Sequence, residues 1–271
     1  MTIENLVQSI LNASWGIYLV FIFIFIFMRI PKRKVFAPYR RSRGFMVVAF
    51  FFLFSQIFLG WTLPKNTLSA EVLAVIDIPF FYIEFIFLCL AFFHLLDHSF
   101  GTYKHVLFDL LSWCVVCAIC LASLTVKNHT FQIILAYVGS FMLICFTILC
   151  VLRFFRMHKI ARTQLDTYYT DQMYNFVLWI RRSIMFIVIF GVFSVAVLFA
   201  PYIFRVVYFV AATIMNVYIA VSFINYSFVF ERVERSFRLS YEQQILLKKT
   251  QTRTSNIKKE DILTEAQKGL M

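Results

Sequence analysis

Seven long runs of apolar residues, separated by short polar connections, constrain the fold of this chain more than any other feature. A helix needs about twenty apolar residues to cross roughly 30 Å of hydrocarbon. The runs predict membrane-spanning helices at approximately 14–30, 45–63, 73–96, 106–124, 131–154, 183–200 and 203–230. The FIFIFIF stretch in the first run alternates like a strand, but an isolated strand leaves its backbone hydrogen bonds unsatisfied in lipid. The expected fold is therefore an all-α integral membrane protein with seven transmembrane helices.

The overall composition agrees with a lipid environment. Of the 271 residues, 61% are hydrophobic and only 15% are charged, whereas soluble domains carry about a quarter charged residues. The net charge of +12 does not indicate nucleic acid, because the basic residues sit beside apolar runs, where they set the orientation of helices. The expected surroundings are a lipid bilayer, with no nucleic acid bound by this chain itself.

Lysine and arginine are distributed unequally between the two sides that seven helices would create. Fourteen fall in the first, third and fifth connections: Arg29, Lys32, Arg33, Lys34, Arg40, Arg41, Arg43, Lys104, Arg153, Arg156, Lys159, Arg162, Arg181 and Arg182. Three fall in the other connections: Lys65, Lys127 and Arg205. Cytoplasmic connections carry the excess of basic residues. The bias predicts an outside N-terminus and a cytoplasmic C-terminus.

The sequence changes character after Phe230, and the change divides the chain into two parts. Residues 1–230 form the predicted seven-helix transmembrane domain, and residues 231–271 form a basic, polar cytoplasmic tail. About forty residues are too few for a separate stable domain. A loose apolar stripe, which includes Val233, Phe237 and Tyr241, predicts that the last helix continues into the tail against a partner helix. That partner is either a cytoplasmic signalling protein or a second copy of the chain.

No motif in the sequence predicts catalysis. It lacks a glycine-rich phosphate loop, a nucleophile elbow and a histidine-rich metal spacing. Cys114, Cys117 and Cys120 share a three-residue spacing, but no charged group flanks them, so they are interpreted as packing residues and not as metal ligands. The chain is therefore not expected to be an enzyme, and no cofactor is expected.

The informative residues are ionisable groups inside the predicted spans. A charge at mid-bilayer costs about 2.5–3.5 kcal/mol on the insertion scale, so Asp77 and Glu84, seven residues apart on one helix face, should point into the bundle. The last helix offers partners: Arg205 and Tyr208 near its outer end, and Asn216 near mid-depth, so that Arg205 is expected near Asp77 and Asn216 near Glu84. Two interpretations stay open, a structural polar bridge and a ligand or proton site open to the outside.

Two further residues complete this set. Asp109 lies just inside the cytoplasmic end of the fourth span and is expected to reach water. Pro79, between the two acids of the third span, can bend that helix and free a carbonyl.

The longest internal connection, at about 156–182, contains a segment that carries a family resemblance. It reads LDTYYTD at 165–171, with Asp166, Tyr168, Tyr169 and Asp171, and Trp179 follows it. Its aromatic rings suit the headgroup zone, and a signalling surface is the alternative interpretation. The segment, with YIAVSFINYSFVF at 218–230, resembles the seven-helix membrane module that precedes an AraC-type helix-turn-helix domain in certain bacterial transcription regulators. The sequence ends where that DNA-binding domain would begin, so DNA binding is not carried over.

The resemblance implies a receptor-like sensor in a bacterial inner membrane. Such a module passes an external or membrane signal to a cytoplasmic partner through the last helix and the tail. Two alternatives stay open: a small transporter or proton-coupled carrier that uses Glu84, and a non-sensing membrane anchor that recruits a partner.

Overall fold

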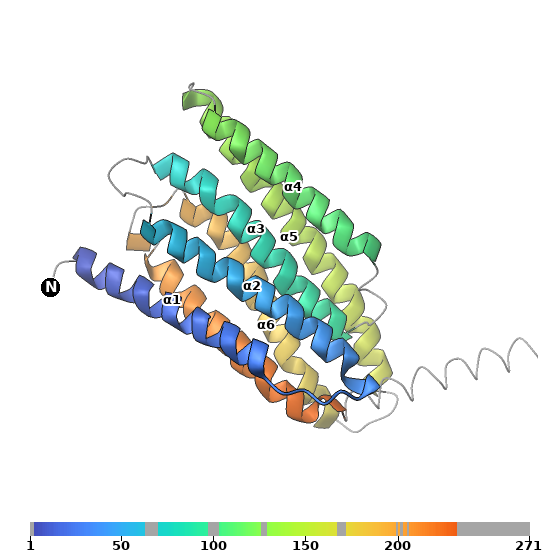
Figure 1. The fold of residues 1–271 in the computed structure, drawn as a ribbon. Coiled ribbons are helices and arrows are strands. Elements are labelled where there is room, and N and C mark those ends of the chain that lie inside the picture. The colour runs from blue at the N-terminus through green and yellow to red at the C-terminus, as the bar shows by residue number, and fades with distance from the viewer. Residues whose placement is uncertain are drawn as a thin grey trace, which may run out of the picture.

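Seven helices run side by side in one bundle (Figure 1). The computed structural model describes residues 3–62, 70–96, 103–125, 129–166, 172–198, 200, 203–204 and 206–231. The helices are α1 (Ile3–Phe27), α2 (Ala37–Thr62), α3 (Ala70–Leu96), α4 (Tyr103–Thr125), α5 (His129–Asp166), α6 (Gln172–Leu198) and a seventh helix (Val206–Glu231). A short 3-10 helix, η1 (Lys34–Phe36), precedes α2. No strand occurs within these described ranges.

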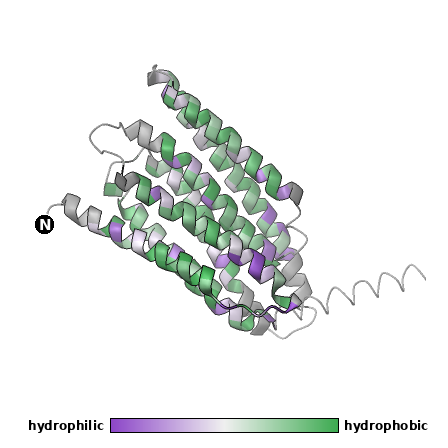
Figure 2. Ribbon diagram, in the orientation of Figure 1, coloured by the Kyte–Doolittle hydropathy of each residue, from purple (hydrophilic) through white to green (hydrophobic). Residues whose placement is uncertain are grey.

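All seven helices are long and apolar enough to cross a membrane, as expected of a multi-pass membrane protein. The predicted number of spans and their helical character are confirmed. In Figure 2, hydrophobic residues cover most of the length of the helices. Large apolar side chains such as Phe27, Phe141 and Phe228 are exposed on the surface of the protein. A surface of this kind would be insoluble in water and is suited to lipid.

Several helices are longer than the apolar runs that predicted them. Helix α2 begins at Ala37 instead of near 45, α5 continues to Asp166, and α6 begins at Gln172. The described parts of the 156–182 connection are therefore helical. Arginine, lysine and glutamine are good helix formers, so these helices extend beyond the apolar segment that hydropathy detects. The tail beyond Glu231, which includes nearly all of the predicted 231–271 region, lies outside the described residues.

Helix α3 occupies the centre of the bundle. It packs against α2, α4, α5 and α6, and every residue from Leu88 to Leu96 is buried. The helix stays continuous through Pro79, whose carbonyl accepts a hydrogen bond from Trp113 Nε1 at 3.0 Å. Because protein surrounds α3, polar groups on this helix face other helices and not lipid.

Arginine side chains organise the connection between α1 and α2. Arg43 Nη1 donates to the Met28 carbonyl and Arg40 Nη1 donates to the Pro31 carbonyl, each at 2.7 Å. The first bond satisfies the carbonyl group that directly follows the end of α1, and the second satisfies a carbonyl group within the connection. Arg33 also forms an ion pair of 3.4 Å with Glu231, at the end of the seventh helix. This end of the bundle, where α1 ends and the seventh helix ends, is called the basic end below.

Candidate functional site

A small cavity lies inside the bundle beside Glu84, near the middle of α3. Its volume is about 40 Å³. Five helices besides α3 contribute to its wall, and its polar lining consists of Tyr18 (α1), Gln56 (α2), Glu84 (α3), Ser194 (α6) and Tyr208 and Asn216 (seventh helix). One water needs roughly 10–15 Å³ when volume is measured in this way. The cavity can hold a few waters or a small ion, but not an organic molecule of ordinary ligand size.

A polar network joins α1 to the seventh helix at one side of this cavity. Asn216 Nδ2 donates a hydrogen bond to the Tyr18 hydroxyl at 3.2 Å. The Tyr18 hydroxyl in turn donates to Thr213 Oγ1 at 3.3 Å. Thr213 Oγ1 in turn lies 3.0 Å from Ser14 Oγ. All four side chains are buried, so the network holds the two helices together within the hydrocarbon region.

The donor groups that line the cavity already make hydrogen bonds elsewhere. The Tyr208 hydroxyl donates to the Phe190 carbonyl at 3.2 Å, and Ser194 Oγ donates to the Gly191 carbonyl at 2.7 Å. Gln56 Nε2 donates to Asp77 Oδ1 at 3.1 Å.

Two acceptor groups at the cavity lack such partners. Asn216 is only 1% exposed, and its Oδ1 has no hydrogen-bond partner among the described residues. Across the same part of the chain, no side chain donates a hydrogen bond to Glu84 or forms an ion pair with it. The Glu84 carboxylate and the Asn216 amide oxygen, which is closed off from any water-sized space, are therefore acceptors without a side-chain donor among the described residues.

The residues predicted from the sequence as a ligand or proton site are only partly brought together. Glu84, Tyr208 and Asn216 line the same cavity. Asp77 instead accepts a hydrogen bond from Gln56 on α2, and Arg205 lies outside the described residues. Sequence reasoning missed Gln56, Tyr18 and Ser194, because hydropathy places residues by depth but does not say which faces of separate helices meet.

Trp179 is the one member of the predicted signalling segment whose side chain is described. Its ring lies 5.6 Å from Phe92 on α3, and 6.5 Å and 5.3 Å from Phe223 and Tyr226 on the seventh helix, measured between ring centroids. Its indole nitrogen is buried and has no partner among the described residues. Trp179 therefore packs inside the protein toward the basic end.

The rest of that segment is described less fully. Asp166 is the last residue of α5, and only its backbone is described. Tyr168, Tyr169 and Asp171 lie outside the described residues. The interpretation of this segment as a headgroup anchor or a signalling surface stays a prediction.

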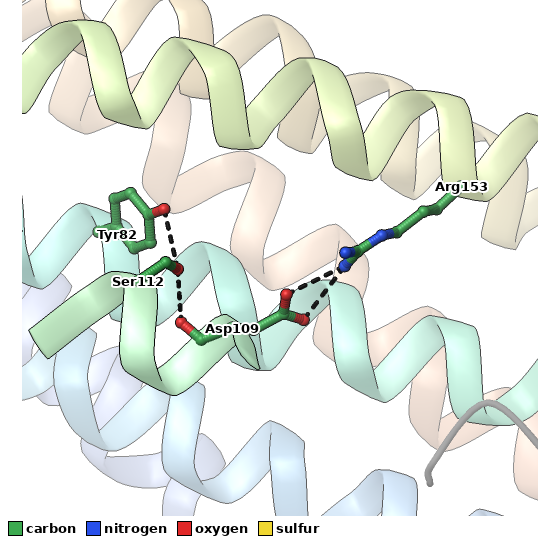
Figure 3. A network of polar contacts seen from close by, with 4 residues as sticks. All are labelled: Tyr82, Asp109, Ser112 and Arg153. Carbon is green, nitrogen blue, oxygen red and sulfur yellow. Dashed lines mark hydrogen bonds and ion pairs between the residues drawn. The ribbon is translucent and has the colours of Figure 1, made fainter. Parts of the chain in front are cut away.

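Asp109 corrects an expectation from the sequence. Its side chain is 3% exposed and does not reach water, because Arg153 on α5 pairs with its carboxylate at 3.0 Å (Figure 3). The same region links Tyr82 on α3 to Ser112, whose hydroxyl donates to the Asp109 carbonyl at 2.7 Å. Arg153 was counted only as an orientation signal in the sequence. Opposite charges at equal depth on neighbouring helices were the signal that could have found this pair.

A second hollow lies between α1 and α2. It has a volume of about 390 Å³ and an almost entirely apolar wall that includes Leu11, Trp15, Ile57 and Phe58. Among the described residues no group of three or more histidine, cysteine or acidic side chains could hold a metal ion, and the six cysteines are free.

The chain was compared with protein-family models, curated proteins and solved structures, and none of them matches it.

Proposed function

We propose that this chain is a receptor-like sensor module of a bacterial inner membrane, with its N-terminus outside and its C-terminus in the cytoplasm. It passes an external or membrane signal through the seventh helix and the tail to a cytoplasmic partner. The observation that carries the proposal is the course of the seventh helix. This one rigid element lines the Glu84 cavity with Asn216, packs on Trp179 with Tyr226, and continues to Glu231 at the basic end.

The geometry supports a mechanical link between the cavity and the tail. Asn216 and Glu231 are fifteen residues apart on one helix, which corresponds to about 22 Å. A shift of 1–2 Å at the cavity would therefore reach the tail without loss, as in other helix-shift switches. At the basic end, the exposed Arg33–Glu231 ion pair contributes little to stability and can break easily.

A signal can act on such a link only by binding two arrangements of the bundle with different affinities. In the proposed mechanism, one arrangement has the seventh helix held against α1 by the Tyr18–Asn216 bond, and the other has this contact altered. The Glu84 carboxyl group at the cavity favours such an exchange, because an acid inside a membrane is costly unless it is neutralised or partnered.

The basic bias of the connections supports the proposed orientation, and the resemblance to AraC-linked membrane modules supports a sensing role. The alternative of a carrier for organic substrates is disfavoured by the cavity volume of about 40 Å³, since ligand sites commonly occupy about 300–1,000 Å³. A proton-coupled carrier that uses Glu84 would show flux into proteoliposomes, and a sensor would not. A plain anchor would tolerate any change at Glu84.

A fusion experiment tests the proposal. An AraC-type DNA-binding domain is joined after Met271 of the full chain, and transcription from its target promoter is measured in bacteria. We expect Glu84→Gln and Trp179→Leu to change the output at unchanged membrane level. Ser140→Ala, a buried polar change on α5 outside the cavity lining, is the control and should behave as wild type. Equal output from all four chains would contradict the proposal.

A further inference from the structure

We propose that the hollow between α1 and α2 binds a compact, neutral aromatic compound that dissolves in the bilayer, of the size of two fused rings with a short substituent. Trp15 on α1 and Phe58 on α2 supply the aromatic wall of this site, and Asn12 supplies its polar group. The hollow lies at the end of the bundle opposite the basic end, within the membrane-spanning part of both helices. A ligand therefore reaches it from the membrane.

The volume of the hollow suits a small organic molecule. It is about 390 Å³, within the range of about 300–1,000 Å³ that ligand sites commonly occupy. An apolar cavity of about 150 Å³ holds one benzene molecule, so at the same ratio this hollow holds about fifteen carbon atoms. The Glu84 cavity, at about 40 Å³, is too small for such a guest.

The hollow is short along the helix axes. Its α1 wall extends from Leu11 to Gly16, and these five steps correspond to about 8 Å. An extended acyl chain with the same number of carbon atoms would protrude beyond both ends, whereas a compact ring system fills a short, wide space. A Cβ atom at Gly16 would meet nothing within 4 Å, so this wall leaves room for a guest.

The aromatic residues at the hollow favour a flat guest. The ring planes of Trp15 and Phe58 are inclined by only 25°, with centroids 6.5 Å apart. Phe54 contacts both rings and is inclined to them by 27° and 8°. Phe58 is 43% exposed, so part of its ring is open to a further contact. Because aromatic rings prefer offset-stacked neighbours, a flat aromatic ligand can extend this stack.

The described lining of the hollow carries no charged side chain. Asn12 is its one polar side chain, and it lies exposed only three residues after Ser9, where the apolar span of α1 begins. An ionised ligand would find no opposite charge among these residues, and its burial would be costly. The ligand is therefore neutral, and a hydroxyl or carbonyl group on it would lie near Asn12, toward the headgroups.

The consequence for signalling rests on the proposed function, whereas the site itself does not. Ile57 lines both this hollow and the Glu84 cavity. Helix α1 is also bonded to the seventh helix through Ser14 and Tyr18. A guest that moves α1 against α2 would therefore act on these bonds. The compound would then be the membrane signal that the seventh helix transmits.

Equilibrium binding of tritiated β-naphthol tests the site. The full chain is held in nanodiscs, and the uptake by empty nanodiscs of the same lipid composition is subtracted. We expect wild type to bind one molecule per chain saturably. This binding should be lost in Gly16→Leu, whose side chain fills the hollow. It should be kept in Gly44→Leu, because a side chain added there also meets open space but lies outside the hollow.

A second pair of variants covers the case in which Gly16→Leu fails to fold. Phe58→Leu keeps an apolar side chain but removes the ring, so the affinity for β-naphthol should fall about twofold to tenfold. Phe51→Leu changes another exposed phenylalanine on α2, outside the hollow, and should bind as wild type does.

Binding that does not saturate would overturn the proposal, and so would equal binding by wild type and Gly16→Leu. Full competition by cetyl alcohol at the same concentration would assign the hollow to an acyl chain instead. A wild-type dimer that dissociates in Gly16→Leu would assign it to a second copy of the chain. The fusion reporter separates site from signal. Binding without a change in transcription would reject the signalling role of the compound, and a missing site with an intact effect of Glu84→Gln would reject the aromatic site alone.

Discussion

Arg153 on α5 donates hydrogen bonds to both carboxylate oxygens of Asp109 on α4, over distances of 3.0 Å and 3.4 Å (Figure 3). The two side chains are 25% and 3% exposed, so the arginine reaches the edge of the bundle while the acid is enclosed. A charge-assisted pair of this kind fixes how α4 and α5 lie against each other. It also explains why an acid is tolerated inside a helix that is otherwise apolar.

Loss of the arginine should therefore cost more than loss of both charges. Arg153→Met leaves the buried Asp109 carboxylate unpaired, and we expect a loss of about 3 kcal/mol in the free energy of unfolding. The double variant Asp109→Asn, Arg153→Met should recover at least half of that loss. Denaturant unfolding in mixed micelles measures both values. If the losses of unfolding free energy in Asp109→Asn and in Arg153→Met simply add up in the double variant, the two residues are not coupled.

Two glycines form a matched pair that tests the packing of α6 on α3. A Cβ atom at Gly191 would lie 3.0 Å from the ring of Phe85, whereas one at Gly44 would meet nothing within 4 Å. Gly44→Ala should stabilise the protein by about 0.5–1 kcal/mol through helix propensity alone. Gly191→Ala should destabilise it by about 1 kcal/mol, because the ring must move and overpack the cavity wall. Thermal unfolding of both variants in the same detergent measures the two changes in stability. An equal increase in the stability of both variants would contradict the contact between Gly191 and Phe85.

The Tyr18 hydroxyl connects α1 to the seventh helix, and its removal should cause a modest loss of stability. Tyr18→Phe removes the hydrogen bonds to Asn216 and Thr213. Interhelical hydrogen bonds in membranes average about 0.6 kcal/mol, so we expect a loss of about 1 kcal/mol in unfolding free energy. Tyr218→Phe is the control, since the contact of this tyrosine with Phe186 is between the two rings and does not involve the hydroxyl. Equal values for the two variants would mean that the network does not stabilise the contact.

The orientation of the bundle can be tested by chemical labelling. In a cysteine-free variant, single cysteines at positions 66 and 128 should react with a membrane-impermeant maleimide on intact cells. A cysteine at position 41, in the basic first turns of α2, should react only after permeabilisation. Labelling of position 41 on intact cells would reverse the proposed orientation.

The number of helices was predictable because the thickness of a bilayer sets a length that apolar runs must match. The true ends of α2, α5 and α6 could not be predicted from hydropathy, because these helices continue through polar residues that favour a helix. Depth along each helix predicted that Asn216 would lie near Glu84, and both residues line one cavity. Tyr208 lines it as well, although the sequence placed it nearer the outer end of the last helix.

The hydrogen-bond partners of Asp77 and Asp109 could not be predicted from the depth of these residues in the membrane. Asp77 bonds to Gln56 because of the rotation of α2 about its own axis, and Asp109 bonds to Arg153 because α4 lies beside α5. Hydropathy sets neither the rotation of a helix nor the choice of its neighbours. These are decided by the packing of many side chains at once, such as the ring of Phe85 against Gly191.

The central claim is that the state of the Glu84 cavity moves the seventh helix at the basic end. Spin labels at Leu152 on α5 and Phe228 on the seventh helix would report this movement, because both side chains point away from the bundle, at 62% and 82% exposure. Distances between the labels are measured by double electron–electron resonance in nanodiscs that contain the otherwise cysteine-free chain. The account predicts two distance populations, whose ratio changes between wild type and Glu84→Gln and stays constant in Ser140→Ala. A single distance distribution, identical in all three chains, would contradict it.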